Sequence, residues 1–165
     1  MIISLNWLRE WIKVDWDLLH LSNLLTTAGL EVSSISEVPR FSNKILIAEI
    51  MSTNHLPGNN NLKICQVDVG QRRNVDIVCG ASNVEAGCRV VVAMPGSSLP
   101  GGESIRVADF NGQKSRGMLC SADDLNLDYS ADNSAGVLIL DSTAPTGNTL
   151  NDYLHVDDHI IDIDL

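Results

Sequence analysis

Apolar residues recur with the 3.6-residue period of a helix in two stretches near the start of the chain. These stretches predict helices over residues 5–12 and 18–28. Ser4 and Asp17 precede them, and both residue types are favoured at helix N-caps because their side chains accept hydrogen bonds from free backbone N–H groups. Gly29 follows the second stretch, at the position where a left-handed residue ends many helices. We therefore expect two short helices, the first of them nearly all core and the second with one apolar face.

From Lys44 onward the apolar positions change to the two-residue alternation of strands. Five β-branched segments are predicted as strands: Ile45–Ile50, Leu62–Val69, Val75–Cys79, Arg89–Met94 and Ser104–Phe110. Turns rich in Gly, Pro and Asn separate them; the first is expected over 57–61, and Asn111-Gly112 is typical of a tight hairpin. Short strands with no long helix between them favour a five-stranded antiparallel barrel of the oligonucleotide/oligosaccharide-binding (OB) type, with a sandwich as the alternative.

The end of the chain alternates in the same way, with Ile161 and Ile163 on one side and aspartates on the other. A strand with one apolar face needs a partner, and so do the N-terminal helices and the extended segment over 30–34. We therefore expect a mainly β protein with an α+β part, in which residues 1–40 and 150–165 form a discontinuous α/β domain. The OB-type barrel, residues 41–149, is inserted into it. The last strand lacks a closing turn, so we expect the polypeptide to continue past Leu165.

Two smaller elements are expected after the fifth strand. Residues 122–127 have the composition of a brief helix, and residues 137–140 form an apolar run that predicts a sixth strand along the outside of the barrel.

The charge of the chain is unevenly distributed. The formal net charge is −10, which by itself argues against a nucleic-acid partner. Residues 44–120, however, carry eight basic and six acidic side chains, whereas residues 121–165 carry ten acidic and no basic ones. Any contact with a polyanion is therefore expected in the middle segment. The alternative is that the uneven charge reflects only a solvated acidic end of the chain.

Catalytic and metal-binding patterns are not evident in the sequence. The four cysteines lie 13, 9 and 32 residues apart, without the close pairs of zinc or redox motifs, and are expected to be reduced and mostly buried. His155 and His159 would share a helix face, but the residues that follow them are strand-like, so we assign no metal site. No phosphate-binding glycine loop or nucleophile elbow is found, and we expect no catalysis by this chain alone.

A cluster of cations lies around the Asn111-Gly112 turn. Arg106 precedes the turn, and Lys114 and Arg116 follow it, so all three can lie near one rim of the barrel and contact phosphates. A second edge is expected from Lys63, Arg72 and Arg73. The alternative is that the charges only keep an exposed strand edge soluble.

Five segments of the sequence together point to one family. They are Ser4–Trp11, Thr27–Val32, Ile77–Val84, Leu99–Gly102 and Gly117–Ser121. With these segments in this order, the chain resembles the N-terminal part of the bacterial phenylalanyl-tRNA synthetase (phenylalanine–tRNA ligase) β subunit over essentially its whole length. The resemblance implies an α/β domain made from both ends and interrupted by a tRNA-binding barrel.

The resemblance also implies a parent enzyme that joins phenylalanine to its tRNA with ATP and Mg²⁺, as a cytoplasmic tetramer of two α and two β subunits. It implies that the synthetic site lies in the α subunit, and that the editing, magnesium-binding and anticodon-reading parts of the β subunit lie beyond residue 165. No cofactor is therefore expected in this chain. The residues expected to contact tRNA are Lys63, Arg106, Lys114, Arg116 and Ser121.

Two features depart from the family pattern or from known single-strand binders. The segment 55–62 is one residue longer than the corresponding family turn and lacks its Asp and basic residue. Residues 42–128 contain a single aromatic residue, Phe110, whereas barrels that hold single strands stack bases on several rings. Two alternatives to a tRNA-binding module of this synthetase therefore remain: a structural or protein-interaction module without RNA contact, and a free-standing tRNA-binding or chaperone-like barrel.

Overall fold

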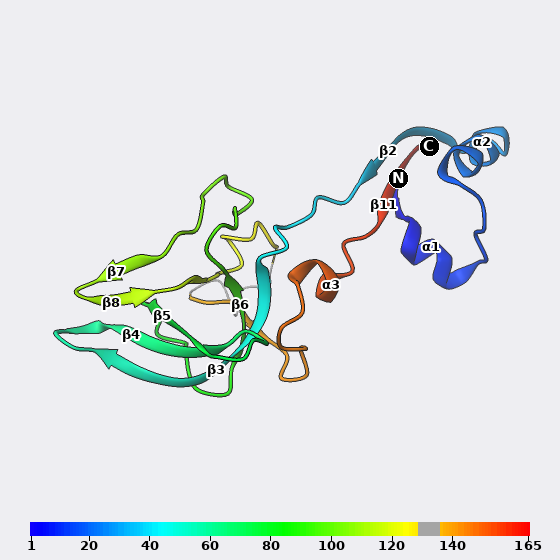
Figure 1. The fold of residues 1–165 in the computed structure, drawn as a ribbon. Helices are drawn as coiled ribbons and strands as arrows, with labels where there is room; N and C mark the ends of the chain where they lie inside the picture. The colour runs from blue at the N-terminus through cyan, green and yellow to red at the C-terminus, as the bar shows by residue number, and fades with distance from the viewer. Residues whose placement is uncertain (129–135) are drawn as a thin grey trace. The chain divides into compact units, whose positions relative to one another are not determined.

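A computed structural model describes residues 1–128 and 136–165 of the chain (Figure 1). The chain forms two compact units, one made of residues 1–40 and 155–165 and the other of residues 41–154. The division differs from the expected boundary at 149/150 by helix α3 (Leu150–Leu154), which packs on strand β3 and so lies in the second unit.

The first unit combines two helices with a three-stranded antiparallel sheet. Its elements are β1 (Ile2–Ser4), α1 (Leu5–Trp11), α2 (Leu18–Thr27), β2 (Glu31–Glu37) and β11 (His159–Asp164). The strand order is β1-β11-β2, so the last strand lies between two strands from the beginning of the chain. The chain termini accordingly lie close together in this unit, as Figure 1 shows.

The helix caps are those that the sequence predicts. The Ser4 side chain accepts a hydrogen bond from the backbone N–H of Trp7 at 3.0 Å, and Asp17 accepts one from His20 at 2.8 Å. Gly29, with φ +93°, follows the second helix in the left-handed conformation that glycine adopts without strain.

The core of the first unit lies between the helices and one face of the sheet. Its fully buried members come from both ends of the chain: Leu5, Val14, Leu21, Ile161 and Ile163. The predicted alternation at the C-terminal end is therefore confirmed, because the buried isoleucines alternate with more exposed aspartates.

Asp158 ties the start of α1 to the start of β11. Its carboxylate accepts hydrogen bonds from the Ser4 hydroxyl, from the Asn6 backbone N–H at 2.9 Å and from the His159 backbone N–H at 2.7 Å. Burial alone would raise the pKa of Asp158, but these three bonds and the nearby His159 imidazole outweigh it and lower the pKa below its ordinary value. The ionised carboxylate therefore stabilises this junction.

The second unit contains a nearly closed five-stranded antiparallel barrel, which confirms the predicted OB-type fold. The main strands are β3 (Ile45–Leu56), β4 (Asn59–Asp68), β5 (Val75–Cys79) and β6 (Arg89–Ala93), hydrogen-bonded in the order β6-β3-β4-β5. Strand β9 (Met118–Leu119) pairs with one part of β6. Strand β10 (Ile139–Leu140), the predicted sixth strand, pairs with another part of β6. The remaining hairpin, β7 (Ala108–Phe110) with β8 (Gln113–Ser115), follows the Asn111-Gly112 turn.

Three local predictions are wrong. Ser104–Phe110 is not the fifth barrel strand. Residues 113–119 take that place between β5 and β6, whereas β7 pairs only with β8. The turn expected over 57–61 is confined to Pro57-Gly58, since Asn59 already pairs with Leu56. Residues 122–127 form turns and no helix, because Asn126 adopts φ +52°, a left-handed conformation that ends the helical turn begun at Ala122.

The interior of the barrel unit is apolar. Its fully buried side chains include Ile45, Ile47, Ile50, Ile77 and Val67. Cys65 and Cys120 are buried, Cys79 and Cys88 are partly buried, and all four thiols are free, as expected. Burial raises the pKa of Cys65 to about 11 and that of Cys120 to about 12, so neither thiol is a nucleophile at neutral pH.

Candidate nucleic-acid interface

Three of the eight cations in the barrel unit use their charged groups within the protein. Lys44 donates to the Pro95 carbonyl at 3.4 Å, and Lys63 donates to the carbonyls of Ser82 and Val84 at 3.4 and 3.2 Å. Arg89 forms an ion pair with Glu49 and also donates to the Thr146 hydroxyl. Lys63 was expected to contact tRNA, but its ammonium holds the loop after β5 in place.

Ser121, another expected contact, is also engaged inside the protein. Its hydroxyl donates to the Asp124 carboxylate at 2.7 Å and accepts a bond from the Asp124 backbone N–H at 3.1 Å. The Ser121 backbone N–H donates to the same carboxylate at 2.7 Å. These reciprocal bonds give Ser121 a clear role in shaping the turn that follows β9.

Lys114 and Arg116 lie on the same side of the strand that closes the barrel. Ser115 between them is buried; its hydroxyl accepts a bond from the Val78 N–H at 3.0 Å and donates to the Gly117 carbonyl at 3.0 Å. The Arg116 backbone N–H donates to the Asp76 carbonyl at 2.9 Å. Because side chains alternate along extended chain, pinning Ser115 inward directs its two neighbours outward.

Replacing Ser115 by alanine should lower the free energy of unfolding by about 1.5 kcal/mol, because the buried N–H of Val78 loses its acceptor. Urea unfolding followed by far-UV circular dichroism measures the change. Ser98→Ala is the matched control, since the Ser98 side chain is exposed, and it should change stability by less than about 0.5 kcal/mol. Equal stabilities for the two variants would contradict the role given to Ser115.

The cationic groove is a hollow of about 490 Å³ beside the barrel seam. It is lined by Gln71, Val75, Met94, Pro95, Val107, Lys114 and Arg116. Both cations are exposed, and none of the lining residues is acidic. The groove therefore combines an apolar floor with two positive charges, which attract an anion.

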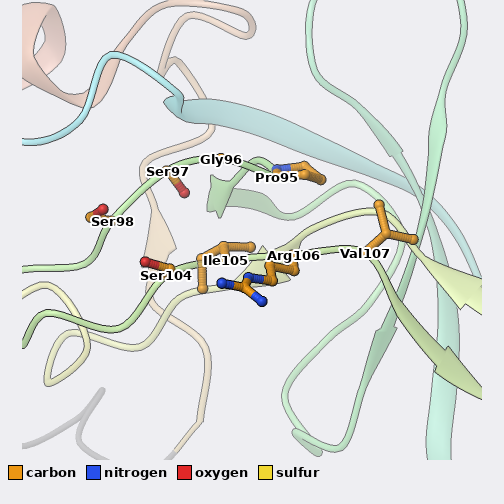
Figure 2. A pocket seen from close by; sticks show the side chains of 8 residues that line it. All are labelled: Pro95, Gly96, Ser97, Ser98, Ser104, Ile105, Arg106 and Val107. Atoms are coloured by element: carbon orange, nitrogen blue, oxygen red, sulfur yellow. The ribbon is translucent and has the colours of Figure 1, made fainter.

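Arg106 lies in a second hollow that adjoins the first. This hollow, of about 300 Å³, shares Pro95 and Val107 with the cationic groove and extends along residues 95–98 and 104–107. Figure 2 shows the two chain segments facing each other, with the Arg106 guanidinium beside Ile105 and the Ser98 and Ser104 hydroxyls further along. The structure thus brings Arg106, Lys114 and Arg116 to two neighbouring hollows.

Arg72 and Arg73 lie next to the groove along the chain. Both are exposed in the loop between β4 and β5, directly after Gln71, which lines the groove.

Asp109 lies opposite Lys114 in the hairpin register, but one of its carboxylate oxygens accepts the Gly112 N–H at 2.7 Å. Within residues 1–128 and 136–165, none of the ion pairs involves Arg72, Arg73, Arg106, Lys114 or Arg116.

Sequence reasoning did not identify the uncharged lining of the groove. Gln71, Val75, Met94 and Pro95 come from the ends of three different strands or loops, so no local pattern relates them to Lys114. The exposure of Val107, whose side chain is 53% accessible although Ile105 two residues earlier is buried, is likewise visible only in the folded structure.

The described residues contain neither a cluster of metal-ligating side chains nor a membrane-spanning helix. No group of three or more His, Cys, Asp or Glu side chains in that part is arranged to hold a metal ion. His155 has φ +52° and His159 begins β11, so the two imidazoles do not share a helix. No helix among residues 1–128 and 136–165 is long and apolar enough to cross a membrane.

An OB-type barrel with unpaired cations around two adjoining hollows is typical of the oligonucleotide-binding class of small β domains. The comparison with protein families narrows the class. Residues 45–149 match the sequence model described as "Putative tRNA binding domain", and the chain belongs to this family.

Curated relatives extend the similarity over the whole chain. The chain is 41% identical over 165 residues to the "Phenylalanine--tRNA ligase beta subunit" of Legionella pneumophila (strain Lens), and 40% identical over 166 residues to that of Dechloromonas aromatica (strain RCB). Each alignment covers 100% of this chain and 20% of the relative, so the chain spans about one fifth of the length of these relatives. The expected resemblance to this β subunit is confirmed.

A solved structure, the "MetRS related protein from Pyrococcus horikoshii", aligns with 63% of this chain and 85% of its own length. The sequence identity is 16% and the TM-score 0.45, a likeness too weak to support an inference about function.

Proposed function

We propose that the barrel unit binds the phosphate backbone of tRNA through Arg106, Lys114 and Arg116, as the tRNA-binding part of a phenylalanine–tRNA ligase β subunit. One observation supports this most directly: the two adjoining hollows are lined by three exposed cations and by no carboxylate among their described residues. Lys63 and Ser121 support the fold around this surface through their internal hydrogen bonds.

The contact is with the backbone more than with the bases. Phe110 is the only aromatic residue between residues 42 and 128, so the barrel has no succession of rings on which bases could stack. Binding that depends on Lys and Arg releases counterions from the nucleic acid. The complex should therefore be weak, strongly dependent on salt and tolerant of sequence.

The proposal extends to the parent enzyme. The parent attaches phenylalanine to tRNA with ATP and Mg²⁺, in the cytoplasm, as an assembly of two α and two β subunits. This chain contributes no catalytic group and binds no cofactor in that reaction; its part is to help position the tRNA. The identity with the β subunits of the relatives supports this assignment.

Reversing two charges of the groove tests the tRNA contact. In the variant carrying Lys114→Glu and Arg116→Glu, tRNA affinity at low salt should fall by about tenfold or more, because two phosphate contacts become repulsive. The slope of log K against log salt should decrease by about 2, one for each lost cation. Fluorescence anisotropy with labelled tRNA at several salt concentrations measures both quantities.

The matched control reverses two charges in the other unit, Arg9→Glu with Lys13→Glu, and leaves the groove unchanged. Both residues are exposed, and Lys13 pairs only with Asp15 two residues away. This control has the same net charge as the test variant, so an equal loss of affinity in both would show a non-specific effect of charge. Unchanged binding of the test variant would rule out the assigned contact.

A second candidate function is a protein-interaction module without RNA contact. The first unit favours it, because Trp7, Trp11 and Leu19 are 52%, 72% and 73% exposed on or near its helices. Exposed apolar groups of this size are typical of surfaces that other proteins cover. The tRNA titration separates the two candidates, since an interaction module would form no salt-dependent complex with tRNA.

A further inference from the structure

We propose that the cationic groove is a binding site for one unpaired nucleotide of RNA. The base and ribose would lie on the apolar floor, and the nucleotide's phosphate would contact Lys114 and Arg116. This inference rests on the proposed function and goes beyond it, because contact with backbone phosphates alone requires no cavity and no distinction between paired and unpaired RNA.

The floor of the groove is the first argument. Val75, Met94 and Pro95 are partly buried and line the groove together with Val107, whose side chain is 53% exposed. A surface that only attracts phosphate gains nothing from exposed apolar side chains, whereas the flat face of a base or a sugar covers them.

The position of the charges is the second argument. Lys114 and Arg116 lie on the same outward side of the strand because the buried Ser115 fixes the alternation between them. Both also line the groove together with its apolar side chains. A nucleotide has the complementary pair of features, an anionic phosphate and a ring with apolar faces.

Gln71 and the volume of the groove are the third argument. Gln71 is the only lining side chain that is polar and uncharged, and its amide both donates and accepts hydrogen bonds. It can therefore meet the edge of a base, and base edges carry both kinds of group. The volume of about 490 Å³ lies within the range of small-molecule sites.

The nucleotide must be unpaired. In a duplex each base is stacked and its edge is occupied by its partner, so the groove could reach only the backbone. A loop, bulge or end can place its base outside the stack, at an energetic cost smaller than that of opening a pair. None of the described residues that line the groove is aromatic, so the contact that they offer is aliphatic and adds a moderate preference to the electrostatic binding.

The test compares two RNA hairpins of equal length and charge, one fully paired in its stem and one with a single bulged nucleotide, in binding to the 165-residue chain. The bulged hairpin should bind about fivefold tighter, as expected for the apolar contact of one side chain. Val107→Gln, which leaves the charge unchanged, should remove this preference, so that this variant binds the two hairpins equally.

The matched control is Met51→Gln. Met51 is also an exposed apolar residue of the barrel unit, 48% accessible on β3, and it does not line the groove. It should keep the fivefold preference. Circular dichroism confirms that both variants are folded, as expected for changes at exposed positions.

The outcomes separate this inference from the proposed function. If both hairpins bind equally, and the Lys114→Glu, Arg116→Glu variant binds neither, the nucleotide site is overturned and the backbone contact stands. If the unaltered chain binds neither hairpin nor tRNA, both fail. If Val107→Gln and Met51→Gln both keep the preference, the unpaired nucleotide binds elsewhere and the groove assignment is wrong.

Discussion

Replacing Gly70 by alanine is expected to lower the free energy of unfolding of the barrel unit by about 3 kcal/mol. A Cβ atom at Gly70 would lie 2.5 Å from the Cα of Gly147, closer than side chains approach backbone atoms, and the φ of Gly70 is +76°. Gly147 cannot retreat freely, because its N–H donates to the Ile47 carbonyl at 2.8 Å. The energetic cost of the strained backbone at Gly70 and the cost of displacing Gly147 therefore add together.

Gly58→Ala separates these two contributions. Gly58 also has a positive φ, +81°, but no atom lies within 4 Å of the position that a Cβ would take. This variant should lose only the conformational term, about 1 kcal/mol. Urea unfolding followed by far-UV circular dichroism gives both values, and similar losses at Gly58 and Gly70 would show that the approach of Gly70 to Gly147 carries no energy.

Replacing Asp158 by alanine is expected to destabilise the first unit by about 2 kcal/mol at neutral pH, because three donors lose a charged acceptor. Two of these donors, the Ser4 hydroxyl and the Asn6 N–H, belong to the start of α1, so the loss also frees the helix cap. All three tryptophans lie within residues 1–40. Thermal or urea unfolding followed by tryptophan fluorescence therefore reports on this unit.

The same variant should alter the dependence of stability on pH. The pKa of Asp158 is lowered in the folded protein, so its stabilisation is complete above the unfolded-state pKa and is lost as the pH falls through the lower, folded-state pKa. The difference between the unaltered chain and Asp158→Ala should therefore shrink as the pH falls below about 4.

Asp157→Ala is the control for Asp158. The Asp157 side chain is 88% exposed and pairs with Arg40 at the surface, where ion pairs contribute little. We expect a change below about 0.5 kcal/mol and no special pH dependence. Equal effects of the two substitutions would mean that the hydrogen bonds to Asp158 do not stabilise the junction.

The parts of the fold that the sequence predicted correctly depend on neighbouring residues. The Ser4 and Asp17 caps bond to N–H groups three residues away, and the Asn111-Gly112 turn needs two adjacent residues with positive φ, which have φ +53° and +88°. Alternation also identified the β strands, because one side of each faces a core. These signals lie within single elements and so appear directly in the sequence.

The incorrect predictions concern choices between distant segments. Extended segments lie on both sides of the Asn111-Gly112 turn, and alternation could not indicate which of the two pairs across the barrel seam. Residues 113–119 pair across the seam because of two hydrogen bonds. The Ser115 hydroxyl accepts the Val78 N–H in place of a backbone carbonyl, and the Arg116 N–H donates to the Asp76 carbonyl. Neither partner is recognisable from residues near 115.

The candidate site shows the same limit. Charge alone indicated Lys114 and Arg116 correctly as outward residues of one hairpin, but it treated Lys63 as equivalent to them. The Lys63 ammonium bonds to carbonyls about 20 residues further along the chain, which only the folded structure brings near. The apolar floor of the groove was missed for the same reason.

The strand order of the first unit has a consequence for biosynthesis. Strands β1 and β2 leave the ribosome before the barrel, whereas β11, which lies between them, leaves after it. At typical translation rates of roughly 5–20 residues per second, the early strands wait on the order of ten seconds for their neighbour. During that interval the barrel has its own complete strand set and can fold first, while the nascent N-terminal helices expose the apolar face that Ile161 and Ile163 later cover. During that interval the uncovered apolar face is open to aggregation or to binding by chaperones.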